Sequence, residues 1–432
     1  MTIEKGISMM VFIIEIFLLI LIEFYVNNAC KGLSKIVLNI FNIMWLGGLA
    51  CSNLGLYKMY TPSMFTNVIF LVSIITFDCI YIFAFNKQQK RMTESFDKID
   101  ANSINLRMLL IVNAFVLIFC IPYFISALKI IRVSGMSYLR HLVYIQSPEY
   151  ISKTYISILF QWFIQPFLQF VLLVAASQIE NIRRQKLLWF FAIINLFFEM
   201  IIFGGGRRTI ITFMLEIIIF YLLQNKKRIV RNIRISKKKI GFIAIVSIIV
   251  YLIVSITASR LTKISVIESL YQYYVGPYIF FDKVIEAGHF NNAATQLGYG
   301  GYTFLFIITP ISVLLSVLGI SKYSNLSTTI NANLNKEMFI GAHSIHNAHA
   351  TSVIYFYSDF GKIFFPFGMV VFALILAYFT KNYKKDSRRF ILGVYFANLA
   401  FYSAQTYPFT GVIQYVVMIC TYIFISKRRS IK

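Results

Sequence analysis

Long apolar runs, separated by short polar segments, dominate the pattern along the chain. A helix needs about 20 apolar residues to cross a bilayer. Runs of roughly this kind occur at 8–26, 36–56, 64–86, 107–127, 155–177, 187–203, 208–223, 240–258, 303–320, 363–380, 390–406 and 411–426. They are continuous, unlike the alternating strands of about 10 residues that build a membrane β-barrel. The pattern therefore predicts an all-α polytopic membrane protein, with 1–432 as a single integral membrane domain.

Basic side chains between the runs give the predicted helices a direction. Lys and Arg gather in five segments, at 87–98, 183–186, 226–239, 381–389 and 427–429. Cytoplasmic loops of membrane proteins carry an excess of Lys and Arg. We therefore expect these segments in the cytoplasm, with the C-terminus inside and the N-terminus outside.

The number of crossings follows from the parity of the runs. Three runs lie between the basic segments 226–239 and 381–389, yet two ends on one side of a membrane require an even number of crossings. The run 303–320 is short and contains Pro310 and Gly319, so we predict that it does not span. This leaves about eleven transmembrane helices.

Two regions are then predicted outside the cytoplasm. The larger is 259–362, in which 303–320 dips into or lies along the membrane and the aromatic, amphipathic segment 266–286 lies at its surface. The smaller is a loop at 128–154. We expect interfacial or re-entrant helices in the larger region.

Composition excludes several classes of protein. Hydrophobic residues make up 58% of the chain and charged residues 13%, against about 25% charged in an ordinary soluble protein, and the mean hydropathy is +0.72. The formal net charge of +24 lies in loops between apolar runs, so it indicates membrane topology and not nucleic-acid binding. The five cysteines are scattered without a CxxC motif, which predicts neither a disulfide framework nor a thiolate metal site.

The segment GGGRRT at 204–209 is the first candidate site. Gly205 and Gly206 allow backbone N–H groups to approach an anion closely, and the following helix offers the partial positive charge of its N-terminus. Arg207 and Arg208 add bidentate phosphate recognition. These features predict a cradle for a diphosphate at the outer membrane surface. The alternative is a tight turn whose arginines extend to the interface.

Arg260 is a second candidate cation for the same diphosphate, because it follows the run 240–258 at its predicted outer end. A second positive charge would help to neutralise a lipid diphosphate. The alternative is an ordinary interfacial anchor, as for Lys263 beside it.

Three histidines, His343, His346 and His349, form the third candidate within GAHSIHNAHATS. On a helix this spacing would place them along one broad face. No HExxH motif, cysteine or carboxylate accompanies them, so we expect no metal. Because histidine titrates near neutral pH, we predict that His346 or His349 acts as a general base or hydrogen-bonding group. The alternative is a polar loop that happens to contain histidines.

Asp359 lies near a predicted membrane boundary, where a carboxylate needs a partner or water. It could orient a histidine or accept a sugar hydroxyl, and it fits equally well as a helix N-cap. Both interpretations stay open, and we count Asp359 among the candidate catalytic residues.

Five carboxylates fall inside apolar runs, namely Glu15, Glu23, Asp78, Glu199 and Glu216. Intramembrane acids occur in proton-coupled transporters, but their spread along the chain argues against one compact ion site. Glu199 and Glu216 flank the Gly-Arg turn, and their simplest role is to pair with its arginines.

Taken together, GGGRRT between two helices, Arg260 at the start of a long outer loop, and HNAHATSVIYFYSDFG before the last helices resemble the bacterial oligosaccharide repeat-unit polymerases of the Wzy type, which assemble O-antigen and capsule. The resemblance implies a fold related to the O-antigen ligases and other membrane-embedded (GT-C-like) glycosyltransferases. It implies polymerisation of undecaprenyl-diphosphate-linked oligosaccharides at the outer side of the bacterial cytoplasmic membrane. Arginines in outer loops are the family's recurring functional residues, a role carried here to Arg207, Arg208 and Arg260, and related ligases keep an important histidine in the corresponding large loop.

The resemblance also implies which partners and rivals to consider. The expected partners are the lipid-linked donor and acceptor, the bilayer and a chain-length regulator protein, with no nucleic acid and no cofactor. An O-antigen ligase shares nearly every feature and differs in its acceptor. A lipid-linked-sugar flippase or transporter would more often show repeated halves and short loops.

Overall fold

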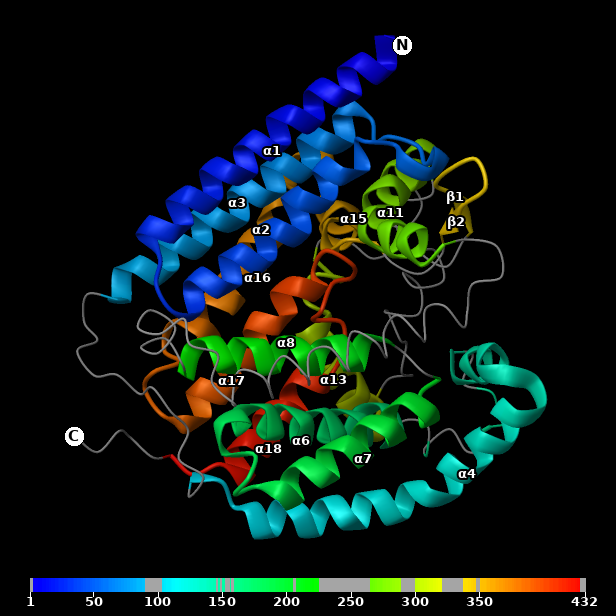
Figure 1. Ribbon diagram of the computed structural model, residues 1–432, viewed down its shortest axis with the longest axis vertical. Coiled ribbons are helices and arrows are strands. Elements are labelled where there is room, and N and C mark those ends of the chain that lie inside the picture. The colour runs from blue at the N-terminus through cyan, green and yellow to red at the C-terminus, as the bar shows by residue number, and fades with distance from the viewer. Residues whose placement is uncertain are drawn as a thin grey trace. The chain divides into compact units, whose positions relative to one another are not determined.

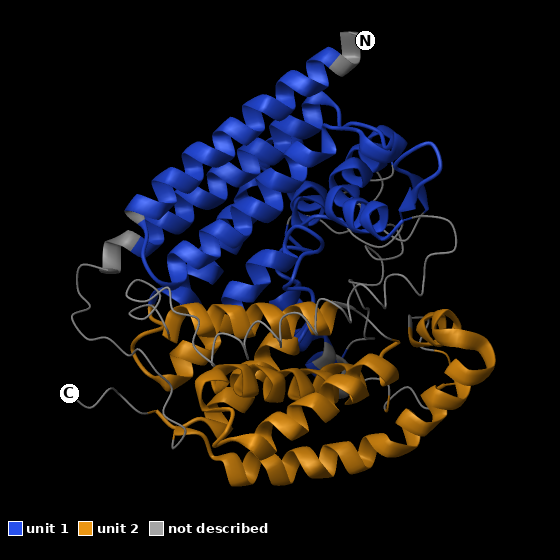
Figure 2. Cartoon of the chain, viewed as in Figure 1, with its two compact units in different colours: residues 1–92, 261–381, 396–412 blue, residues 93–260, 382–395, 413–432 orange. Residues whose placement is uncertain are grey.

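The computed structural model describes residues 3–89, 103–204, 207–224, 265–288, 300–320, 337–346 and 350–427, apart from several positions between 145 and 158. The described chain is mostly helical (Figure 1). It divides into two compact units (Figure 2). Unit 1 contains residues 1–92, 261–381 and 396–412, and unit 2 contains 93–260, 382–395 and 413–432.

Unit 1 is built on long N-terminal helices and on segments from the predicted outer region. Its elements are α1 (Ile3–Ala29), α2 (Leu33–Ser52), the short helix η1 (Leu56–Lys58), α3 (Met64–Gln89), α11 (Val266–Glu286), α13 (Leu305–Val317), β1 (Met338–Phe339), β2 (Ile345–His346), α15 (Ser352–Phe364) and α16 (Pro366–Lys381). The helix expected at 266–286 is therefore confirmed. The strands β1 and β2 pair antiparallel, with Met338 opposite His346.

Unit 2 is also built mainly of helices in its described part. Its elements are α4 (Leu106–Tyr144), the π-helix η3 (Phe160–Ile164), α6 (Gln165–Ser177), η4 (Ile179–Asn181), α7 (Lys186–Ile202), α8 (Arg207–Gln224) and α18 (Ile413–Phe424). The residues of α17 (Ser387–Tyr402) divide between the two units.

Five described helices are long and apolar enough to cross a bilayer. They are Gly6–Asn28, Leu33–Ser52, Met64–Phe85, Leu106–Val143 and Phe160–Ser177. Pro366–Lys381 and Ile413–Phe424 are apolar but shorter, and the run 240–258 lies outside the described residues. The described helices agree with a polytopic membrane protein, and the number of eleven crossings stays a prediction.

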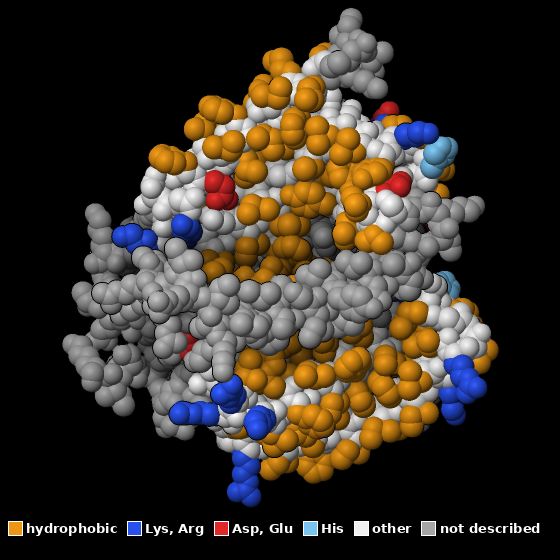
Figure 3. Space-filling view, in the orientation of Figure 1, with side chains coloured by type: hydrophobic (Ala, Val, Ile, Leu, Met, Phe, Trp, Pro, Cys, Tyr) orange, Lys and Arg blue, Asp and Glu red, His pale blue; other side chains and the backbone are white. Residues whose placement is uncertain are grey.

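The surface of both units carries many apolar side chains, as lipid contact requires. Figure 3 shows hydrophobic side chains over broad areas of each unit, with Lys and Arg in separate groups. On α1, Phe17 and Phe24 are 59% and 69% exposed. In water such patches would be costly, so these faces favour a hydrocarbon environment.

The helix α13 bears on the parity argument. It has 13 residues and is therefore about 20 Å long, which is short of a hydrocarbon core of about 30 Å. Ile307, Ile311 and Leu314 are exposed along one side of it. This geometry is compatible with the prediction that 303–320 does not span.

Aromatic packing holds the helices of unit 1 together. Phe41 on α2 stacks on Phe77 on α3, with 3.7 Å between ring centroids. Tyr278 on α11 donates a hydrogen bond of 2.6 Å to the Met44 carbonyl. A side chain at Gly48 would meet the Tyr278 ring at 2.6 Å, so the small residue permits this close approach.

The region 128–154 differs from the expected loop. Helix α4 continues through residues 128–144 and is broken only at Gly135, where φ is 83°. The apolar stretch ALKIIRV explains the continuation, because it extends the helical pattern beyond the predicted span. A glycine tolerates the left-handed backbone at the break.

Candidate functional site

The Gly-Arg turn connects α7 to α8 in unit 2. Gly204 has φ +78°, a conformation that L side chains rarely adopt, and a Cβ there would lie 3.0 Å from the Arg140 Cα. Arg140 Nε in turn donates a hydrogen bond of 3.0 Å to the Gly204 carbonyl. The extension of α4 therefore packs on this turn. Arg140 is a site residue to which sequence reasoning gave no role at the turn, because that contact is between distant segments.

Only two of the predicted diphosphate-binding residues, Arg207 and Arg208, are described by the structure. Arg207 and Arg208 begin α8, so they stand in the first turn, where backbone N–H groups lack helical acceptors. The Arg208 side chain is exposed. Gly205 and Gly206 lie outside the described residues, and so does Arg260. The helix N-terminus that the sequence predicts after the glycines is confirmed.

A buried carboxylate on α7 accepts a hydrogen bond from the first turn of α8. Glu199, 1% exposed, accepts hydrogen bonds at Oε1 from Thr209 Oγ1 at 2.9 Å and from Gln169 Nε2 at 2.7 Å. Gln165 Nε2 lies 3.4 Å from the same oxygen, and the positive charge of Arg208 acts on the carboxylate. Glu199 on α7 thus connects this helix to α6 and to the first turn of α8.

Gln165 and Gln169, the two glutamines that donate to Glu199, carry a sequence signal. Together with Gln161, which lines the neighbouring cavity, they recur every four residues within an apolar run, and such spacing places side chains on one helix face. They begin on the π-helix η3, a local geometry that is frequent at functional sites. Polar residues at helical spacing inside a membrane run were thus the sign that could have found them.

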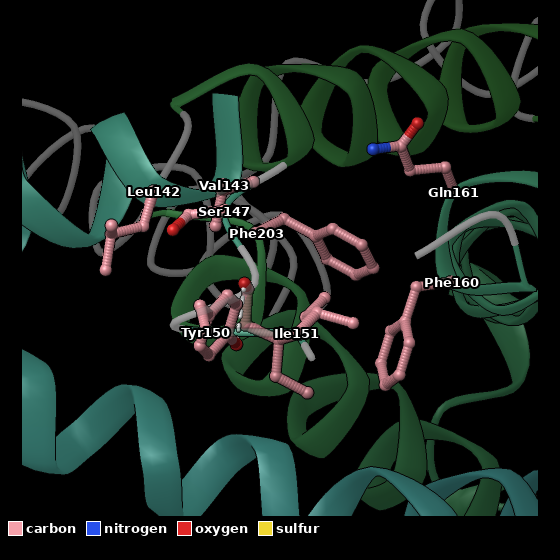
Figure 4. Close-up of a pocket in the computed structure, with 9 residues that line it drawn as sticks. Leu142, Val143, Ser147, Tyr150, Ile151, Phe160, Gln161 and Phe203 are labelled. Atoms are coloured by element: carbon pink, nitrogen blue, oxygen red, sulfur yellow. Dashed lines mark hydrogen bonds between the residues drawn. The ribbon is translucent and has the colours of Figure 1, made fainter. Parts of the chain in front are cut away.

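A small cavity lies beside the turn, between the end of α4 and the end of α7 (Figure 4). Its volume is about 20 Å³, roughly the room that one water molecule needs. It is lined by Leu142, Val143, Ser147, Tyr150, Ile151, Phe160, Gln161, Ile202 and Phe203. Tyr150 donates a hydrogen bond of 3.0 Å to the Ile202 carbonyl, and burial raises the pKa of its hydroxyl. The cavity is too small for a sugar, so a glycan at this turn would lie outside it.

His346 occupies a different setting from the helix that the spacing suggested. It lies on strand β2 and not on a helix, so the helical spacing does not apply at His346. The imidazole is 8% exposed, and its ring centroid lies 5.4 Å from that of Phe280. A Cβ at Gly276 on α11 would meet the ring at 3.0 Å. His346 therefore packs the β-hairpin onto α11, while His349 lies outside the described residues.

Asp359 anchors a turn of the backbone. Its carboxylate accepts hydrogen bonds from the backbone N–H of Tyr302 at 3.0 Å and from both the N–H and Oγ1 of Thr303 at 2.6 Å. Burial raises the pKa of Asp359, while these hydrogen bonds lower it in part. Tyr407 donates to the Thr303 carbonyl at 2.8 Å. The residue holds the segment before α13 on α15. Because Asp359 lies inside α15, it is not a helix N-cap, and its contact with His349 stays a prediction because His349 lies outside the described residues.

The candidate residues thus fall into two groups, each described within its own unit. Arg207, Arg208 and Glu199 belong to unit 2, and His346 and Asp359 belong to unit 1. Chemically, the first group offers an exposed cation at a helix N-terminus, which suits an anion. Comparison with protein-family models, curated proteins and solved structures finds no match for this chain.

Proposed function

We propose that this protein polymerises undecaprenyl-diphosphate-linked oligosaccharide repeat units at the outer face of a bacterial cytoplasmic membrane. The observation that carries the proposal is the exposed Arg208 in the first turn of α8, above the buried Glu199 network. A helix N-terminus and an arginine together suit a phosphate group at a membrane surface. The resemblance of the sequence to repeat-unit polymerases supplies the substrate class.

The arrangement of unit 2 supports the proposed orientation. Helix α7 runs from Lys186 to Ile202, so the basic segment 183–186 and the Gly-Arg turn lie about 25 Å apart along it. At the basic end, the Gln224 side chain bonds to the Ser177 carbonyl. The segments expected in the cytoplasm are thus at one end of α7 and α8, and the arginine turn is at the other.

In unit 1, segments that we place outside the cytoplasm pack on one another. The backbone N–H of Tyr60, in the connection between α2 and α3, donates a hydrogen bond of 2.9 Å to the Ile340 carbonyl beside the β-hairpin. Thr66 at the start of α3 donates to Asp282 on α11 at 2.6 Å. Parts of the predicted outer region 259–362 therefore pack on the end of α3 that the topology also places outside.

The proposed chemistry is glycosyl transfer from a lipid diphosphate. A hydroxyl of the incoming repeat unit attacks the anomeric carbon of the growing glycan, and the bond from that carbon to the diphosphate oxygen breaks. Arg207, Arg208 and Arg260 stabilise the negative charge on the leaving diphosphate. His346 or His349 accepts the hydroxyl proton. The transition state resembles an oxocarbenium ion, and no metal or cofactor takes part.

The structure supports the proposed role of the arginines better than the proposed roles of His346 and Asp359. Burial of His346 against α11 favours packing for that residue, so it would need to become accessible to act as the base. Both oxygens of Asp359 are engaged with the backbone at 302–303, which favours a positioning role. The arginine turn is thus the better supported half of the proposed site.

Alanine variants of the turn test the proposal in cells. Arg207→Ala and Arg208→Ala should abolish elongation while single repeat units still reach the surface, as gel analysis of the glycan would show. Arg184→Ala is the matched control, because Arg184 is also exposed but precedes the opposite end of α7. Polymer of unchanged length in both turn variants would overturn the proposal.

Two rivals predict different products. An O-antigen ligase would move a finished glycan onto another acceptor, so its loss would leave long lipid-linked polymer. A flippase would move lipid-linked units across the membrane without joining them. Analysis of which intermediate accumulates in the Arg208→Ala strain separates these possibilities.

A further inference from the structure

Asp78, a carboxylate inside the membrane part of unit 1, lacks the hydrogen-bond donors that Glu15 and Glu199 have. Asp78 on α3 is 7% exposed, and among the described residues neither of its buried oxygens has a hydrogen-bond partner. Glu15 on α1 accepts a hydrogen bond of 2.9 Å from Asn53, and Glu199 has several donors. Asp78 therefore has a different environment from these acids.

An amide faces this carboxyl group from the neighbouring helix. Asn42 on α2 is fully buried and lies against the Asp78 side chain. In the described part of the chain, both its amide nitrogen and its amide oxygen lack a hydrogen-bond partner. A neutral carboxylic acid donates with its O–H and accepts with its carbonyl oxygen. It could therefore satisfy both atoms of an amide, whereas a carboxylate could only accept.

The charges around Asp78 and Asn42 also favour a proton on the Asp78 carboxyl group. An ionised carboxylate in an apolar interior is costly without a cation, and in proteins such groups are commonly neutralised by protonation. The titratable groups that act on Asp78 are Glu23 on α1, a second acid, and the thiol of Cys30, which follows α1. Lys35 on α2 acts on Glu23. The positive charge of Lys35 thus offsets Glu23, the acid nearer the basic segments.

The other elements packed on α3 have their polar groups occupied. From α16, Thr380 shares a hydrogen bond of 2.8 Å with Tyr81. From α11, Asp282 accepts from Ser63 and Thr66, and Tyr278 donates to a backbone carbonyl. None of these provides a described partner for Asp78.

The position of these groups gives the site a direction. Lys35 lies in the first turn of α2 and half-buried Glu23 lies in the last two turns of α1. Asn42 and Asp78 lie deeper, about 13 Å beyond the start of α2 and about 16 Å before the end of α3 at 1.5 Å per residue. This is the end of α3 that leads to the basic segment 87–98. Glu23 and Lys35 therefore mark an entrance from that side.

We propose that Asp78 and Asn42 form a proton-binding site within the membrane part of unit 1, with Glu23 at its entrance. The site takes one proton onto the Asp78 carboxylate from the side of the basic segments. Its residues belong to unit 1, and it shares none with the proposed diphosphate site of unit 2. It also revises the expectation that the membrane acids are dispersed, because Glu23 and Asp78 come together.

Infrared spectroscopy of the full chain in lipid vesicles at neutral pH tests this site. The carbonyl band of a protonated carboxylic acid should appear, shift when aspartate is labelled with ¹³C, and disappear in Asp78→Asn. Asp282→Asn is the matched control, because it removes a buried aspartate that has three donated hydrogen bonds, and it should leave the band in place. Loss of only carboxylate bands in Asp78→Asn would overturn the proposal.

A second measurement covers the case in which Asp78→Asn does not accumulate. An apolar carbodiimide modifies protonated carboxyl groups in membranes, and peptide mass spectrometry locates the modified residue in the unaltered protein. We expect modification at Asp78 that decreases several-fold as the pH is raised. An aspartate band in the infrared spectrum with no modification of Asp78 would assign the proton to another residue and contradict the proposal.

Discussion

Thr209 Oγ1 donates a hydrogen bond of 2.9 Å to Glu199 Oε1, and this bond joins the last turn of α7 to the first turn of α8. The same oxygen accepts from Gln169 on α6. Three helices of unit 2 thus meet at one carboxylate behind the first turn of α8. We infer that Glu199 fixes the position of this turn and of Arg208 within it.

Replacing this carboxylate should loosen unit 2. Glu199→Ala removes the acceptor of buried Thr209 and half-buried Gln169, and loss of the acceptor of a buried donor costs about 1–3 kcal/mol. We expect a decrease of about 2–4 kcal/mol in unfolding free energy, measured by denaturation in detergent. Glu199→Gln keeps one acceptor oxygen and should lose less.

Thr209 provides the matched pair for this test. Thr209→Val removes the hydroxyl with little change in volume, whereas Thr209→Ser retains it. Thr209→Val should therefore destabilise the protein more than Thr209→Ser does. Equal stability of Glu199→Ala and the unaltered protein would contradict the bracing role of the carboxylate.

The turn itself should not tolerate a side chain at position 204. Gly204→Ala places a Cβ 3.0 Å from the Arg140 Cα at φ +78°, and a left-handed conformation costs an L residue about 1–2 kcal/mol before the contact is counted. We expect a loss of at least about 1 kcal/mol in stability, together with shorter glycan chains. Gly411→Ala is the control, because a Cβ there meets nothing within 4 Å. Identical behaviour of the two variants would show that the turn is not constrained.

A pair of variants can distinguish a structural role of Asp359 from a catalytic one. If it acts by holding the turn at 302–303, Asp359→Asn and Thr303→Val should both lower stability, by about 1–3 kcal/mol for the first, and should affect elongation in parallel. We expect this parallel behaviour, followed by thermal unfolding and glycan gels on the same preparations. Loss of elongation in Asp359→Asn alone, at unchanged stability, would instead make the carboxylate catalytic.

His346 can be tested without emptying its packing site. His346→Phe retains a ring between Gly276 and Phe280 but removes both imidazole nitrogens. If the histidine segment supplies the base, the combination of His346→Phe and His349→Ala should reduce elongation by about 10²-fold or more while the fold persists. Retained elongation in the folded double variant would remove histidine from the mechanism.

The helices of this protein follow directly from its apolar runs, because run length and continuity are local properties. Pro310 and Gly319 marked the run that contains the short helix α13, and its failure to span the membrane stays a prediction. The helical 128–144 region was not foreseen, since the predicted apolar run ended at 127 and the helix continues past it. Local pattern thus identifies helices better than it identifies their ends.

The site was predictable only where neighbouring residues define it. Gly204 and the arginines after it are adjacent in sequence, so their turn could be recognised. The contact of Arg140 with the turn, and the pairing of the α6 glutamines with Glu199, depend on packing between distant segments. The strand at His346 could not be predicted from the spacing of the histidines, because the hairpin that contains it packs on α11.

Purified protein in detergent, supplied with a lipid-diphosphate-linked oligosaccharide and no ion gradient, gives the most direct test of the proposed polymerase. We predict products that contain two or more repeat units on one lipid, release of free lipid diphosphate, and loss of both with Arg207→Ala combined with Arg208→Ala. Substrate that stays as single repeat units with the unaltered protein, under conditions in which it remains folded, would contradict the proposed function.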